Sequence, residues 1–229
     1  MQGKYPRSIY IVLTNPLPGK EAEFNYWYNY VHAPDGLGWG TFDRIYRYKA
    51  VEERPERFLA IWESDYTDLT DGLAKADRDT EDLIERGRLW PVFERAWSRP
   101  FASIGPTAPP NQRPVTLITT TQMSCAPKHA EAFARWHDDV HVGQTLGADS
   151  YHTVYRFQRA DQPSADAVEF LTVYESDADP AALAESANDW FEPIDDTHVK
   201  PRSAGESLPQ DFVIQVEPHW KATWLPIWP

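Results

Sequence analysis

The chain repeats itself. Residues between positions 18 and 47 return between positions 127 and 156 without a gap, 109 places later, and the stretch 58–65 returns as 170–177, so the second hairpin loop is longer. A repeat of this length matches a small domain and far exceeds a solenoid unit. We therefore expect a first repeat (1–105), a linker (106–114), a second repeat (115–218) and a Trp-rich tail (219–229). The residues kept in the longer stretch are Pro18/Pro127, Phe24/Phe133, Trp27/Trp136, Val31/Val140, His32/His141, Gly38/Gly147, Tyr46/Tyr155 and Arg47/Arg156.

Each half has the pattern of a βαββαβ unit. In the first half, alternating or β-branched runs predict strands at 8–13, 41–51, 57–64 and 100–104, and helical spacing predicts helices at 21–32 and 69–88. The second half predicts strands at 116–121, 150–158, 168–175 and 212–216, with helices at 128–141 and 180–190. This order indicates an α+β fold of two tandem ferredoxin-like repeats. Since the second face of each sheet needs a cover, we expect the repeats to pack sheet to sheet as an intramolecular α+β barrel with a cavity.

Bulk composition narrows the partners. A formal net charge of −13 opposes binding to nucleic acid, and no run of about 20 apolar residues predicts a membrane span. A single cysteine excludes an intrachain disulfide and favours a reducing compartment, so we expect a cytoplasmic protein without a signal peptide. Ten tryptophans suit an apolar pocket, a core or an interface, and the Trp-rich tail is a candidate surface for a homodimer.

One segment resembles a known family. The stretch 15–32, which reads NPLPGKEAEFNYWYNYVH and precedes Pro34 and a glycine-rich run, is similar to the EthD-like branch of the dimeric α+β barrel superfamily. The second copy, FARWHDDVH at 133–141, matches more loosely. Relatives of this barrel include cofactor-free oxygenases of phenolic or quinone compounds, lactone isomerases, polyketide cyclases and haem enzymes. The resemblance implies the fold, and it does not choose among these activities.

Two histidines are the first catalytic candidates. His32 and His141 are each expected at the C-terminal end of a helix, where the macrodipole favours the imidazolium form, so each could act as a general acid or base or simply cap the helix. Tyr28 and His137 lie four residues earlier on the same helix face and are also catalytic candidates. The His137–His141 spacing could chelate a metal, but no third ligand is evident, and we expect no metal.

The second strand of each repeat carries a Tyr-Arg pair. Because side chains alternate along a strand, one member of each pair faces the barrel interior and the other faces the helices or solvent. An inward arginine would bind a carboxylate, phenolate or enolate oxygen, whereas an outward one would pair with Glu63 or Glu175 on the neighbouring strand. The substrate-binding candidates on these strands are Tyr46, Arg47, Tyr155 and Arg156.

Three further residues complete the candidate site. Trp27 and Trp136 fit the core between helix and sheet, with a stacking platform for substrate as the alternative. Asp35 is a substrate-binding candidate in the first repeat only, since Gln144 stands at the matching position. This asymmetry favours chemistry in one repeat and divergence in the other.

These residues support three functional hypotheses. The first is a cofactor-independent enzyme that uses histidine-centred acid–base chemistry on a small aromatic or cyclic compound, as a lyase, isomerase or cyclase. The second is an oxidoreductase of the same superfamily, either a cofactor-free monooxygenase or a haem enzyme with His32 or His141 as axial ligand. The third is a non-catalytic module that binds a small hydrophobic molecule or closes an oligomer through the tail.

Overall fold

A computed structural model describes most of the chain. The described residues are 1, 5–67, 69–89, 93–106, 113–148, 150–161, 166–180, 183, 190–202, 208–209, 211–216 and 221–228. The chain divides into two compact units, one built on residues 6–103 and the other on residues 104–224. Of the described terminal residues, Met1 and 225–228 belong to the first unit, and Tyr5 belongs to the second. In the described ranges no helix is both long enough and apolar enough to cross a membrane.

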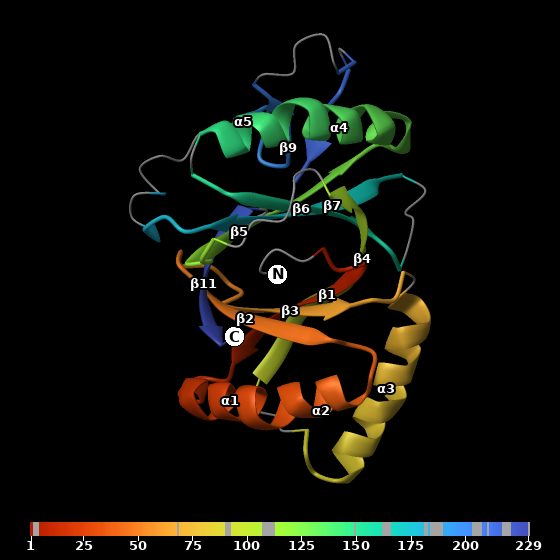
Figure 1. Cartoon of the computed structure of the whole chain (residues 1–229), viewed down its shortest axis with the longest axis vertical. Coiled ribbons are helices and arrows are strands. Elements are labelled where there is room, and N and C mark those ends of the chain that lie inside the picture. The colour runs from red at the N-terminus through yellow and green to blue at the C-terminus, as the bar shows by residue number, and fades with distance from the viewer. Residues whose placement is uncertain are drawn as a thin grey trace. The chain divides into compact units, whose positions relative to one another are not determined.

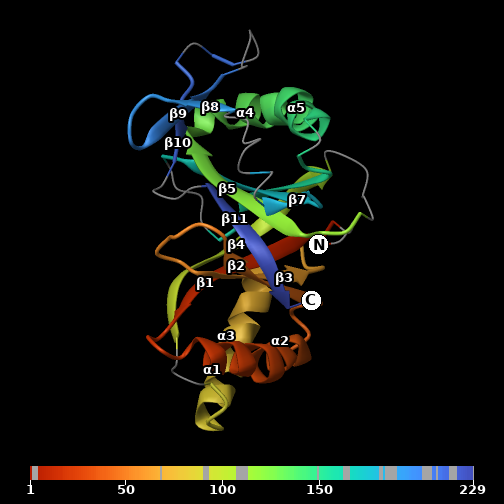
Figure 2. The ribbon, with the colours of Figure 1, turned by 90° about the vertical axis from the view of Figure 1, so that its left-hand side faces the viewer.

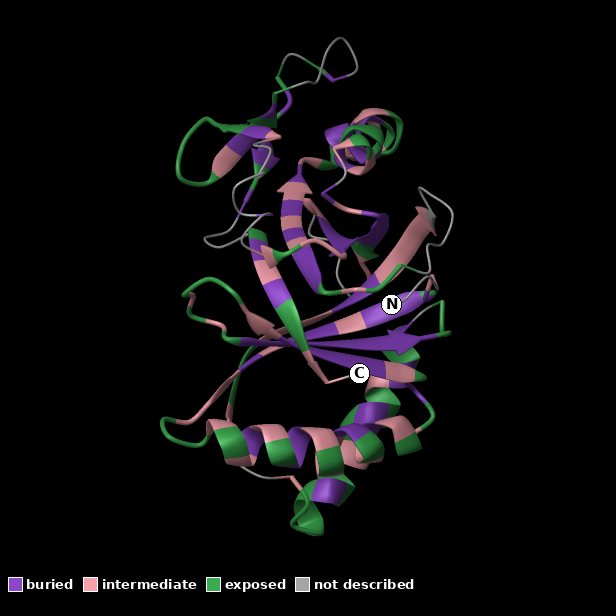
Figure 3. Ribbon diagram, turned by 60° about the vertical axis from the view of Figure 1, so that its left-hand side comes forward, coloured by how far each residue is buried: buried purple, intermediate pink, exposed green. Residues whose placement is uncertain are grey.

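The first unit contains an antiparallel sheet in the order β2–β3–β1–β4. Its strands are β1 (Ser8–Pro16), β2 (Arg44–Ala50), β3 (Phe58–Ser64) and β4 (Phe93–Pro106), the last of which ends in the second unit. The central strand β3 is buried along its whole length (Figure 3). This is the strand order of a ferredoxin-like unit, as the sequence predicts.

Helices cover one face of this sheet (Figure 1). They are α1 (Glu21–Trp27), the π-helical turn η1 (Tyr28–His32), α2 (Ala33–Gly38) and α3 (Leu69–Glu85). Aromatic side chains from α1 and η1 pack with alternate residues of β1 and β3 to form the core between the helices and the sheet, and the outer helix faces are exposed. The periodicity of three and four that predicted this helix thus marks its buried face.

The first helix is longer than the sequence predicts. We expected Pro34 and the following glycines to end it at His32, but the helical backbone continues to Gly38. Pro34 lies in the first turn of α2, where a proline is tolerated because the hydrogen-bond pattern already changes there. His32 therefore lies inside a continuous helical segment instead of at its C-terminal end.

The second unit repeats the same order. Its strands β5 (Leu117–Cys125), β6 (Thr153–Arg159) and β7 (Val168–Ser176) are antiparallel in the order β6–β7–β5. Its helical segment comprises η2 (Pro127–His129), α4 (Ala130–Trp136), the π-helical turn η3 (His137–His141) and α5 (Val142–Gly147). This segment also extends past the histidine at which we expected it to end.

The C-terminal part of the second unit departs from the first. Most of the helix predicted at 180–190, and residues 107–112 of the linker predicted at 106–114, lie outside the described residues. Short strands β8 (Phe191–Pro193), β9 (His198–Pro201) and β10 (Ile214–Gln215) lie beside α4 (Figure 2) and complete its core. The tail forms β11 (Lys221–Trp228), whose first four residues pair antiparallel with β5.

Candidate functional site

A π-helical turn carries the histidine in both repeats. The backbone N–H of Ala33 bonds the carbonyl of Tyr28, and that of Val142 bonds the carbonyl of His137, five residues back in each case. Such turns are rare and often occur at functional sites. The two turns occupy matching positions of the repeat, so they are the starting point for the site.

Each turn organises an aromatic cluster around its histidine. The first cluster is Trp27, Tyr28, His32 and Trp62, and the second cluster is Trp136, His137, His141 and Tyr174. In both, the side chains four residues apart have ring centroids separated by 4.8 Å, and the tryptophan stacks on the final histidine at 4.8 Å in the first cluster and 5.1 Å in the second. The shared backbone therefore places each final histidine in the same way against the preceding tryptophan and against the ring four residues earlier.

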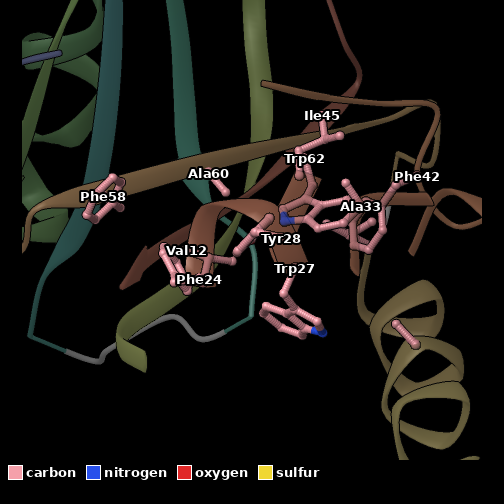
Figure 4. Close-up of a cluster of buried hydrophobic side chains, with 12 residues drawn as sticks. Val12, Phe24, Trp27, Tyr28, Ala33, Phe42, Ile45, Phe58, Ala60 and Trp62 are labelled. Atoms are coloured by element: carbon pink, nitrogen blue, oxygen red, sulfur yellow. The ribbon is translucent and has the colours of Figure 1, made fainter. Parts of the chain in front are cut away.

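His32 makes no hydrogen bond through its ring among the described residues. Its Nδ1 is buried without a partner there, and Trp62 of β3 presents an indole at 5.5 Å between centroids. Figure 4 shows Tyr28 and Trp62 between the helix and the sheet. Burial lowers the pKa of His32 to about 4, and the nearby Asp35 carboxylate only partly opposes this. The first cluster thus holds a neutral imidazole with free ring nitrogens.

In the second cluster, both histidines make hydrogen bonds through Nε2. Nε2 of His141 shares a 3.0 Å hydrogen bond with the hydroxyl of Tyr174, and Nε2 of His137 shares one of 3.2 Å with the hydroxyl of Thr172. Burial lowers the pKa of His141 to about 3 and that of His137 well below its usual value, and Arg156 lowers both further. Nδ1 remains unpartnered on both rings.

These pKa directions correct one sequence-based expectation. We expected a helix terminus to favour the imidazolium form, but both histidines lie inside helical segments and burial favours the neutral form. Burial was not visible in the spacing of residues. The expectation of an acid–base histidine poised near neutral pH therefore loses its physical basis.

The strand arginines face the helices. Arg47 donates to the side-chain oxygens of Asn29 at 2.5 Å and Asn25 at 2.9 Å, and its guanidinium lies 4.1 Å from the ring centre of Tyr28. Arg156 instead donates to the carboxylate of Asp138 at 2.5 Å. Burial lowers the pKa of Arg47 to about 10. Both arginines tie the second strand to the π-helical turn.

The expected partners of these arginines are wrong. Residues Arg47 and Arg156 are paired in register with Ala60 and Thr172, so the glutamates of β3 and β7 belong to the opposite face. On that face of the second unit, the hydroxyl of Tyr155 donates to the buried Glu175 at 3.0 Å. Tyr46 occupies the matching position of the first repeat and is also buried.

Asp35 forms an ion pair with Arg88, a residue that the sequence analysis did not predict to be part of the site. The guanidinium of Arg88 donates to both carboxylate oxygens of Asp35, each at 2.8 Å, and the indole N–H of Trp27 donates to the carbonyl of Arg88 at 2.9 Å. Residues 35 and 88 lie far apart in the sequence, and no spacing rule connects them. The Gly87-Arg88 step after a long helix was the signal that could have drawn attention to this position.

Comparisons with known proteins place the fold. A scan against family models finds no match, and a search of curated proteins finds no relative. An encapsulated DyP-type peroxidase from Mycobacterium smegmatis aligns over 97% of this chain and 93% of its own length, with a TM-score of 0.55 and 10% identity. An anthrone oxidase-like protein aligns over 96% and 91%, with a TM-score of 0.52 and 10% identity. A protein assigned as a chlorite dismutase aligns over 96% and 94%, with a TM-score of 0.50 and 10% identity.

These structures are of the dimeric α+β barrel type, so the expected α+β barrel fold is confirmed. At 10% identity the likeness establishes the fold alone. The comparisons contradict the expectation that no cofactor takes part, because these structural neighbours point to haem instead.

Proposed function

We propose that this chain is a haem-binding oxidoreductase and that His32 is its iron ligand. The observation that carries the proposal is the open imidazole of His32, which makes no hydrogen bond among the described residues, whereas His137 and His141 each use Nε2 in one. The haem proteins among the structural neighbours support this cofactor over none.

The residues around His32 fit an iron ligand chemically. A neutral imidazole is the commonest protein ligand for transition metals, and a pKa of about 4 keeps His32 neutral at pH 7. The indoles of Trp27, Trp39 and Trp62 surround the ring with flat apolar surface, as cofactor sites commonly do. Bound at this histidine, haem would supply one-electron and oxygen chemistry.

The neighbouring side chains have distinct tasks in this proposal. Trp27 holds the plane of the imidazole by stacking at an angle of 12°. Tyr28 remains a neutral phenol, since burial raises its pKa to about 12, and the cation of Arg47 lies over its ring. An imidazole with a pKa of about 4 is a weak base, so acid–base catalysis by His32 near neutral pH is disfavoured.

Other parts of the sequence-based hypothesis stay predictions. They are a small hydrophobic or aromatic substrate, membership of the EthD-like branch, a cytoplasmic location and a homodimer formed through the tail. The oxidoreductase class includes the monooxygenase that the sequence suggested as an alternative. A visible spectrum distinguishes this proposal from a protein that only binds small molecules.

The test is a spectrophotometric titration of the purified chain with haemin. Wild-type protein should develop a saturable Soret band, and His32→Ala should weaken haem binding by at least about tenfold. His141→Ala, the matched variant in the other repeat, should keep the affinity, and Tyr174→Phe should give the second repeat a weak new site by freeing Nε2. Circular dichroism checks that each variant is folded. No saturable band, or loss of the band in His141→Ala alone, would contradict the proposal.

A further inference from the structure

Three contacts connect the end of α3 to both sides of His32. The guanidinium of Arg88 binds the carboxylate of Asp35 through two hydrogen bonds of 2.8 Å, and the carbonyl of Arg88 accepts the 2.9 Å hydrogen bond from the indole of Trp27. Trp27 stacks on His32, and Asp35 follows His32 by three residues on the same helical segment. The imidazole is therefore enclosed in a loop of contacts that passes through one residue, Arg88.

The local backbone explains why Arg88 reaches this place. At the end of α3 the N–H of Arg88 bonds the carbonyl of Leu83 at 2.9 Å, and Gly87 between them has a φ of 65°. This is a glycine helix stop, in which the residue after glycine turns back over the last helical turn. Its side chain and its carbonyl can then both point toward the first helix.

From this loop we infer that Asp35 and Arg88 are positioning residues for His32: together they clamp Trp27 and fix the plane of the imidazole. The inference rests on the proposed function for its chemical purpose, since a metal ligand must keep one ring orientation. Neither residue touches a bound group in this scheme, and both act through Trp27 and the helical backbone.

The second repeat supports this reading by contrast. Gln144, an exposed neutral residue, stands where the first repeat has Asp35, so the same ion pair cannot form there. His141 instead has a direct hydrogen bond to Tyr174. One repeat orients its histidine by a bond to the ring, and the other does so by a clamp that leaves the ring nitrogens free.

A purely structural role would have different consequences. The side chains of Arg88 and Asp35 are 46% and 18% exposed, and exposed ion pairs contribute about 0–1 kcal/mol. Breaking this pair should therefore change the free energy of unfolding by about 1 kcal/mol or less. The positioning role predicts in addition that the orientation of the Trp27 and His32 rings changes, which a purely structural ion pair would not require.

The test uses the full chain with and without haemin. Asp35→Asn and Arg88→Lys should shift the indole N–H proton resonance of Trp27, which Trp27→Phe identifies, and should shift the iron–imidazole stretching band of the ferrous haem form in resonance Raman spectra. Asp35→Glu should restore most of both signals, because it keeps a carboxylate for the two-pronged bond. Asp177→Asn breaks a comparable two-pronged pair with Arg113 in the second unit and should leave both signals unchanged.

Each outcome has a defined meaning. Wild-type positions of both signals in Asp35→Asn, or equal shifts in Asp177→Asn, would overturn the positioning role. If the chain binds no haemin but the Trp27 resonance still shifts in Asp35→Asn, the clamp stands and the proposed function fails. If haemin binds through His32 and neither signal responds to Asp35 or Arg88, the proposed function stands and the clamp fails.

Discussion

The two aromatic clusters have the same backbone conformation and differ in the hydrogen bonding of the histidine. In the second cluster the strand residue is Tyr174, whose hydroxyl shares a hydrogen bond with His141, and the buried Thr145 stands at the helix position that matches Gly36. In the first cluster the strand residue is Trp62, and Gly36 faces it. A Cβ on Gly36 would lie 2.6 Å from the Trp62 ring, so the larger indole requires the glycine. The strand residue, Trp62 or Tyr174, thus determines whether the imidazole of its repeat has a hydrogen-bond partner.

The charges around the clusters differ as well. Arg156 has a carboxylate partner in Asp138, whereas the matching Arg47, among the described residues, has the amide oxygens of Asn25 and Asn29 and nearby aromatic rings. In the part of the chain that the structure describes, the first repeat therefore buries a positive charge beside Tyr28 without a carboxylate partner. This teaches that the duplicated scaffold tolerates opposite electrostatic settings at one position.

The largest expected effect is the loss of stability in acid. The pKa values of His32, His137 and His141 are lowered by burial, so below about pH 6.5 the unfolded chain takes up protons that the folded chain does not. Stability present above that pH is lost as the pH falls toward 4, with a slope of up to about 4 kcal/mol per pH unit for three protons. Urea unfolding between pH 7 and 4.5 measures this slope.

A matched variant measures how much of this pH dependence of the free energy of unfolding comes from His137 in the second cluster. His137→Tyr combined with Thr172→Ala copies the first repeat, which has Tyr28 and Ala60 at these positions. It should reduce the slope by the share of one proton, about 1.4 kcal/mol per pH unit. An unchanged slope would mean that His137 is already protonated in the folded chain.

The second prediction tests whether the contact between Gly36 and Trp62 accounts for the packing difference between the two clusters. Gly36→Thr should destabilise the chain by about 1–3 kcal/mol, because the new side chain overlaps the indole of Trp62. Adding Trp62→Tyr, which completes the residue pair of the second repeat, should recover most of that loss and offer His32 a phenol partner. Thermal unfolding of both variants is the measurement. A single variant as stable as wild type would show that Trp62 can move aside without cost.

The smallest expected effect concerns the unmatched arginine. Asn29→Asp gives Arg47 the carboxylate that Arg156 has and should stabilise the chain by about 1 kcal/mol or less, since the site is partly exposed. The reverse change, Asp138→Asn, should destabilise it by a similar amount. Chemical denaturation at low ionic strength compares them. Destabilisation by both changes would indicate that Arg47 depends on the amide geometry of Asn29.

The sequence predicted the fold better than the site. Alternation and helical spacing placed β1, β3 and the aromatic face of α1, because these patterns report directly which side of an element is buried. The π-helical turns were missed because a bond from residue 33 to residue 28 has no signature in residue types. The lowered pKa of His32 and the Asp35–Arg88 pair were missed because both depend on residues brought together only by the folded chain.

The π-helical turn also bears on whether the histidine was present before the chain was duplicated. The same irregular hydrogen bond occurs at matching positions of both halves, from residue 33 to 28 and from residue 142 to 137. A feature common to both copies was inherited from the half-length ancestor, before duplication joined them. The copies differ at the matched positions 36 and 145 and at 62 and 174, so at least one member of each pair changed after the duplication. The ancestral half thus already carried the histidine, and the fusion allowed its two descendants to specialise.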